Sequence, residues 1–91
     1  MLFAVHYEIT PEHRDEALKR FQKFGDDAPK GTKVVANWFS VTLLEGWTII
    51  QGDDVADLCK LFLPWTNLNV NHITPVIEGA AVHKFIEANK K

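Results

Sequence analysis

The fold is decided by the stretch Leu2-Phe3-Ala4-Val5-His6-Tyr7-Glu8-Ile9, which is followed at once by Thr10-Pro11. Its β-branched and aromatic residues predict a strand. Thr10 is a suitable N-cap, and Pro11 stands where proline is favoured, at the first position of a helix. The sequence therefore predicts a strand that leads directly into a helix over about residues 11–24.

Three further strands are expected along the chain. Residues 33–41 and 47–51 have strand composition and are joined by a plausible hairpin at 42–46, and a fourth strand is expected around 68–74. Residues 25–32 are rich in turn formers and lack apolar periodicity, which predicts a loop.

Two more helices complete the pattern. Asp54 is an acidic N-cap for a helix whose apolar stripe includes Cys59, which we expect to be buried, and Pro64 ends that helix. A short C-terminal helix, before the basic tail Lys90-Lys91, is predicted by Val82, Phe85 and Ile86. The order strand, helix, strand, strand, helix, strand is that of an α+β, ferredoxin-like fold. We expect one domain over residues 1–91, with a four-stranded antiparallel sheet and helices on one of its faces.

The face without helices is expected to be apolar. In the first strand, side chains alternate, so His6 and Glu8 share the open face with Leu2 and Ala4. In the second strand the two alternating sets are Val34, Ala36, Trp38 and Ser40 against Val35, Asn37, Phe39 and Val41. Both sets are largely apolar, and a small monomer rarely exposes so much apolar surface. We therefore expect a homodimer that packs through the open sheet face and resembles a barrel.

Composition excludes several classes of function. The net charge of −2 argues against a nucleic-acid-binding protein, whose affinity rests on neutralising phosphates. No apolar run is long enough to span a membrane, and the N-terminal residues do not have the pattern of a signal peptide. The single cysteine excludes an internal disulfide and suits a cytoplasmic location. Its four histidines lack the paired spacing of metal ligands, so we expect neither a metal nor another cofactor.

His6 and Glu8 are the candidate catalytic residues. They are two positions apart on one strand, so both side chains can enter a cleft on the open face. Imidazole changes its charge near neutral pH, which suits proton transfer, and a carboxylate can orient it. The alternative interpretation is a histidine that is buried at a dimer interface and has only a structural role.

Aromatic and polar side chains supply the candidate ligand-binding residues. Trp38 and Trp65 offer flat apolar walls for a hydrophobic or aromatic ligand, although tryptophan in a small domain also serves packing. Asn37 and His72 are expected to add polar groups to the same cleft. Which face of the sheet is occupied by Asn69, Asn71 and His72 depends on the strand register and stays open.

Residues spread over nearly the whole chain carry a resemblance to a known family. The residues concerned are Met1-Leu2-Phe3, Phe24-Gly25, Pro29-x-Gly31, Trp38, Trp65-x-Asn67-Leu68 and Ile73-Thr74-Pro75-Val76. Their order resembles the bacterial family known as domain of unknown function 3303. More loosely, the part from Trp47 through Gly52-Asp53-Asp54-Val55 to Leu58 is similar to antibiotic-biosynthesis-monooxygenase-like members of the dimeric α+β barrel superfamily.

The resemblance implies a ferredoxin-like protomer and a barrel-like dimer, but no activity. The superfamily includes cofactor-free monooxygenases, haem-degrading enzymes, isomerases and ligand-binding proteins. Its haem-degrading members use an Asn, a Trp and a His, and here His6 stands where that Asn is expected. We expect a protein that binds a small hydrophobic or aromatic ligand. The alternative is a cofactor-free monooxygenase or isomerase that uses His6 as its acid or base.

Overall fold

The computed structural model describes residues 1–25 and 27–90. In chain order its elements are β1 (Leu2–Ile9), the 3-10 turn η1 (Pro11–His13), α1 (Arg14–Phe24), β2 (Thr32–Phe39), β3 (Glu45–Gly52), α2 (Val55–Phe62), β4 (Asn69–Val76) and α3 (Gly79–Ala88). Asp26 of the predicted loop and Lys91 of the predicted tail lie outside the described residues.

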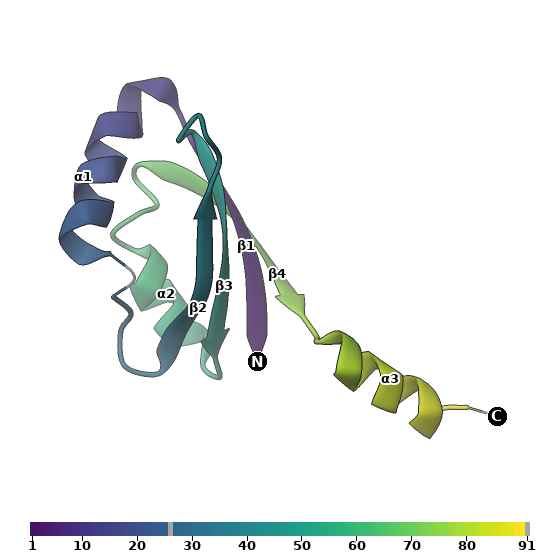
Figure 1. Cartoon of the computed structure of the whole chain (residues 1–91). Helices are drawn as coiled ribbons and strands as arrows, with labels where there is room; N and C mark the ends of the chain where they lie inside the picture. The colour runs from purple at the N-terminus through teal and green to yellow at the C-terminus, as the bar shows by residue number, and fades with distance from the viewer. Residues whose placement is uncertain (26, 91) are drawn as a thin grey trace.

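The strands form a single antiparallel sheet in the order β2-β3-β1-β4. Helices α1 and α2 lie on the same side of this sheet, whereas α3 projects beyond the end of β4 (Figure 1). The predicted α+β, ferredoxin-like fold with a C-terminal helix is therefore confirmed. Within the described part of the chain, none of the helices has the length and apolar character needed to cross a membrane.

The core lies between β1 and the two covering helices. The alternate residues Phe3, Val5, Tyr7 and Ile9 are buried on the helix side, which confirms the predicted parity of β1. Helix α2 contributes Leu58 and Leu61 to the same cluster. Cys59, by contrast, is exposed, so the prediction that it is buried is wrong. The reason is that the side of α2 that packs on the core carries Leu58 and Leu61, whereas Cys59 lies on a side of the helix that stays exposed.

A β-bulge in β2 changes the predicted grouping of its residues. Val34 pairs with Ile50 and Ala36 pairs with Ile49, so Val35 is an extra residue between them. Beyond the bulge, Asn37 pairs with Thr48 on the helix side. Val34 therefore shares the helix side with Asn37 and Phe39, and its predicted grouping with Ala36 and Trp38 is wrong. An extra residue on one strand interrupts the alternation that a period of two assumes.

Capping residues fix where the helices begin. Thr10 has the extended conformation of an N-cap and Pro11 follows it, as predicted, but the Thr10 hydroxyl lies 2.8 Å from His13 Nδ1 instead of binding a backbone amide. Asp54 caps α2 through an oxygen that accepts a hydrogen bond from the Ala56 amide at 2.9 Å. This cap satisfies one of the free backbone donors at the start of the helix.

Candidate functional site

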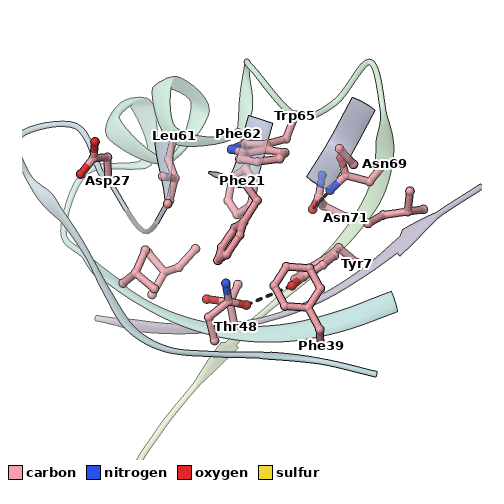
Figure 2. A pocket seen from close by; sticks show the side chains of 16 residues that line it. Tyr7, Phe21, Asp27, Phe39, Thr48, Leu61, Phe62, Trp65, Asn69 and Asn71 are labelled. Atoms are coloured by element: carbon pink, nitrogen blue, oxygen red, sulfur yellow. Dashed lines mark hydrogen bonds between the residues drawn. The ribbon is translucent and has the colours of Figure 1, made fainter. Parts of the chain in front are cut away.

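A cavity of about 80 Å³ lies between the helices and the sheet. Its walls come from both layers, with Phe21 of α1 and Trp65 on one side and Tyr7, Phe39 and Thr48 of the strands on the other (Figure 2). The cavity is thus on the helix-covered side of the sheet, whereas the sequence led us to expect a cleft on the open side.

The sheet side of the cavity is fixed by hydrogen bonds. The Tyr7 hydroxyl donates to Asn37 Oδ1 at 3.0 Å, and Thr48 Oγ1 donates to the Ala36 carbonyl oxygen at 2.8 Å. Tyr7 reaches across Gly46, where an added Cβ would be only 2.3 Å from the tyrosine ring. A glycine at this position of β3 is therefore needed for the observed place of the Tyr7 ring.

Aromatic contacts form much of the remaining wall. Phe39 meets Tyr7 edge-on with 5.7 Å between ring centroids, and it meets Phe21 in the same way at 5.0 Å. Half-buried Trp65 comes from the turn after α2. Arg20 of α1 holds this turn, because its guanidinium donates to the Pro64 carbonyl oxygen and to Asn67 Oδ1.

Two asparagines of the edge strand β4 bring polar groups to the cavity. Asn69 pairs with Ile9 and Asn71 pairs with Tyr7, which places both amides on the helix side. Asn69 Nδ2 lies 3.5 Å from Asn71 Oδ1. The other two amide atoms, Asn69 Oδ1 and Asn71 Nδ2, are buried without a hydrogen-bond partner among residues 1–25 and 27–90. Such unsatisfied groups are unusual because leaving one unpaired costs about 1–3 kcal/mol.

The open face of the sheet carries a row of four rings that crosses all four strands. We call the side chains of Trp38, Trp47, His6 and His72 the ring row. His6 stacks on Trp47 with 5.3 Å between ring centroids and on His72 with 6.0 Å. Trp38 and Trp47 are 57% and 43% exposed, so the tryptophan end of the row is largely open to solvent.

Each histidine of the ring row has a carboxylate from a neighbouring strand. His6 Nε2 lies 3.6 Å from Glu45 Oε1, and His72 Nε2 lies 3.9 Å from Glu8 Oε2. The distance from His6 Nε2 to Glu45 Oε1 is beyond that of a hydrogen bond, and His6 Nε2 is buried with no hydrogen-bond partner among the described residues. The carboxylate beside His6 is thus Glu45, and the predicted partner Glu8 faces His72 instead.

The predicted site residues therefore divide between two faces. His6, Glu8, Trp38 and His72 lie on the open face, while Asn37 and Trp65 line the cavity under the helices. Asn37 and Trp38 are neighbours in one strand, so alternation already excluded a shared cleft.

Sequence reasoning missed several residues that the structure places at these sites. Trp47 is part of the ring row, and Glu45 is the carboxylate beside His6. Phe21 is part of the cavity wall. Trp47 lies opposite His6 through the pairing of β1 with β3, two strands that are not consecutive in the chain, so no local sequence signal gave this register. The side of Asn69 and Asn71, left open by the sequence, is the cavity side.

Acidic, histidine and cysteine side chains form no cluster of three or more that suits a metal ion within residues 1–25 and 27–90. The chemistry offered by the described residues is therefore of two kinds. The cavity combines aromatic walls with neutral amides and the carboxylate of Asp27, and the open face combines stacked imidazoles with carboxylates.

Comparison with known proteins gives a family and a distant structural match. The family model described as "Domain of unknown function (DUF3303)" matches residues 1–90. No protein with a curated description matches the chain. A solved structure titled "Crystal Structure of MjSpt4:Spt5 complex conformation B" is similar at 18% sequence identity with a TM-score of 0.37. That match covers 100% of this chain but 57% of the other.

Proposed function

Because this chain belongs to the DUF3303 family, whose description names no activity, we propose a function from its own residues: it binds a small, mainly aromatic molecule in the cavity under its helices. The observation that carries the proposal is the pair of unpartnered amide atoms on Asn69 and Asn71. Binding pockets are typically apolar and aromatic with a few polar groups that orient the ligand. This cavity has that composition.

The two amides favour one ligand chemistry. A free carbonyl oxygen beside a free N–H group is the complement of a carboxamide, a lactam or a protonated carboxylic acid, each of which presents a donor next to an acceptor. Reversing both amides would exchange their roles and still leave one donor and one acceptor. Neither asparagine brings a charge, so a neutral group is favoured over a carboxylate.

The size of the cavity limits how much of the ligand enters. Its volume of about 80 Å³ is roughly half that of a ~150 Å³ cavity known to hold benzene. We therefore assign the interior to the polar group of the ligand. Its ring is assigned to the side of the cavity formed by Phe21 and Trp65.

The test is a titration with benzamide, followed by the amide shifts of the protein in NMR spectra. Benzamide should shift the signals of residues around the cavity and bind at least tenfold more tightly than toluene, which lacks the polar group. Asn71→Asp removes the free donor and should weaken benzamide binding about tenfold, whereas Asn89→Asp, the same change outside the cavity, should have no effect. Equal affinities for benzamide and toluene would refute the role of the two amides.

The open face supports a homodimer as part of this proposal. Trp38 and Trp47 expose much of their surface side by side, and an apolar patch of this kind typically marks an interaction site. Burial of this face against a second copy would give the barrel-like dimer. Sedimentation should then show self-association that Trp38→Glu reduces and that Lys19→Glu, on α1, leaves intact. A wild-type chain that stays monomeric at 100 μM, roughly a hundred times a micromolar dissociation constant, would refute the interface.

An enzymatic role for His6 is the second candidate, favoured by the position of Glu45. A carboxylate 3.6 Å from Nε2 can stabilise the protonated imidazole during proton transfer. Acetophenone has exchangeable protons beside its carbonyl and serves as a probe. Exchange of these protons in D2O should be accelerated by the protein, lost in His6→Ala and retained in His13→Ala. No acceleration over buffer would remove this candidate.

A cytoplasmic location is also proposed. The free thiol of Cys59 is exposed, and such a thiol persists best where the surroundings are reducing.

A further inference from the structure

In the described part of the chain, no other helix or strand packs closely against helix α3. It leaves the end of β4 and points away from the sheet and the other helices (Figure 1). None of its residues is buried, and Phe85 and Ile86 are 62% and 55% exposed. A helix of this length, 10 residues, is marginal in water on its own, because most helical stability in proteins comes from packing an apolar face. Something must therefore cover this helix when it is formed.

The apolar residues of α3 lie on one side of it. Val82, Phe85 and Ile86 are spaced by three and four positions and form a single stripe, while Lys84 and Glu87 point to the opposite side. This pattern is typical of a helix that docks on an apolar surface.

The same chain has an uncovered apolar groove. It lies between α2 and β4, has a volume of about 470 Å³, and includes Val55, Cys59 and Leu63 of the helix side and Ile73 and Pro75 of the strand. Val55 and Leu63 are 70% and 75% exposed. One protomer thus has both an apolar helix face that packs on nothing and an apolar groove that no helix covers in the described residues.

The protomer exposes more surface than a compact chain of its mass, and the excess is large enough for a dimer interface. The chain exposes 6621 Å², whereas a compact monomer of 10.3 kDa exposes about 5,400 Å², an excess of about 1,200 Å². A stable dimer of standard size buries roughly 800 Å² on each partner. The radius of gyration of 15.3 Å is likewise larger than the approximately 12 Å of a compact domain of this length.

We propose that α3 docks in the α2–β4 groove of a second copy of this chain, and that α3 of the second copy docks in the groove of the first. The short connection between β4 and α3 is extended at Glu78, with φ −69° and ψ 149°, and it carries the helix away from its own groove. A reciprocal exchange covers both apolar surfaces on both protomers at once. It uses different residues from the ring row, so it is separate from the dimer through the open face.

Cys59 is a natural probe of this contact, since it is exposed in the protomer and lies in the groove. Its rate of reaction with Ellman's reagent should fall at least tenfold as the protein concentration rises from 1 to 100 μM. Phe85→Asp should abolish this protection, and Lys84→Asp, on the opposite side of α3, should keep it. If Cys59 were protected equally at all protein concentrations, α3 would fold back on its own chain. If Cys59 were not protected at any concentration, the groove would stay open. Either result overturns the proposal.

A disulfide experiment distinguishes the two copies directly. The double variant Cys59→Ser, Ile86→Cys is mixed with the wild-type chain, unfolded and refolded together, and then oxidised. A covalent dimer should form at least tenfold more readily than with the matched variant Cys59→Ser, Glu87→Cys, whose new thiol lies on the far side of the helix. Equal yields from the two variants would contradict the proposed docking.

Discussion

Replacing Gly46 by alanine should destabilise the protein through a clash with Tyr7. An added Cβ would lie 2.3 Å from both Cζ and the hydroxyl oxygen of the tyrosine and 2.6 Å from the Trp38 carbonyl oxygen. Ordinary contact begins near 3.4 Å, so the ring must move by about 1 Å. The ring is only 8% exposed, contacts Phe39 and donates a hydrogen bond to Asn37, so it has little room to move.

The magnitude follows from two contributions. Overpacking of a core costs about 1–3 kcal/mol, and loss of the hydrogen bond to Asn37 costs about 1 kcal/mol more, which gives a loss of roughly 2–4 kcal/mol. For a domain of this size, each kcal/mol lowers Tm by about 4–8 °C, so we expect a fall of about 10–25 °C. Circular dichroism during heating measures Tm, and urea unfolding measures the free energy.

Gly79→Ala is the matched control, because no atom lies within 4 Å of an added Cβ there. Alanine at that position, at the start of α3, should leave Tm unchanged or raise it slightly. In a Tyr7→Leu background the effect of Gly46→Ala should shrink but not vanish, since the two shortest contacts are with the tyrosine and the contact with the Trp38 carbonyl oxygen remains. If Gly46→Ala were as stable as Gly79→Ala, the close packing of Tyr7 on β3 would be refuted.

Three further changes test other parts of the fold. Asp54→Ala removes the cap on the Ala56 amide and should lower the free energy of unfolding in urea by about 1 kcal/mol, whereas Asp54→Ser should recover most of it. Leu43, in the turn between β2 and β3, has φ 62°, a conformation that glycine adopts more easily than leucine. Leu43→Gly should therefore raise the free energy of unfolding by roughly 1 kcal/mol, and a lower value would show that the leucine side chain contributes to packing. Arg20→Ala frees the turn that carries Trp65 and should cost about 1–2 kcal/mol while changing tryptophan fluorescence; an unchanged spectrum would contradict this anchoring.

The fold could be predicted from the sequence because its signals are local. Alternation in residues 2–9 identified β1 and its buried face, and Asp54 and Pro64 marked where α2 begins and where it must stop. Each of these signals depends on neighbouring residues and not on the rest of the molecule. Element order then determined the topology, because few arrangements satisfy that order.

The sites could be predicted only in part because they depend on pairing between strands. Glu8 was expected beside His6 along one strand, but the carboxylate close to His6 comes from the adjacent strand as Glu45. Glu45 pairs directly with Glu8 and lies diagonally across from His6, and side chains in such diagonal positions are still within reach of one another when they are long or aromatic. Asn37 was misplaced because it was assigned to the same cleft as Trp38, although neighbours in a strand face opposite sides; the pairing of Asn37 with Thr48 then shows that its side is the helix side.

The bulge at Val35 has a consequence for how the length of this strand can vary among related chains. Removal of Val35 alone would leave Val34 and Asn37 facing the helices and Ala36 and Trp38 facing away, because the remaining residues already alternate. A one-residue deletion at Trp38 would instead turn Asn37 out of the cavity if the strand regained a regular ladder. A homologue with a shorter second strand therefore retains the cavity only when its missing residue falls at the bulge, and gaps in this strand should concentrate there.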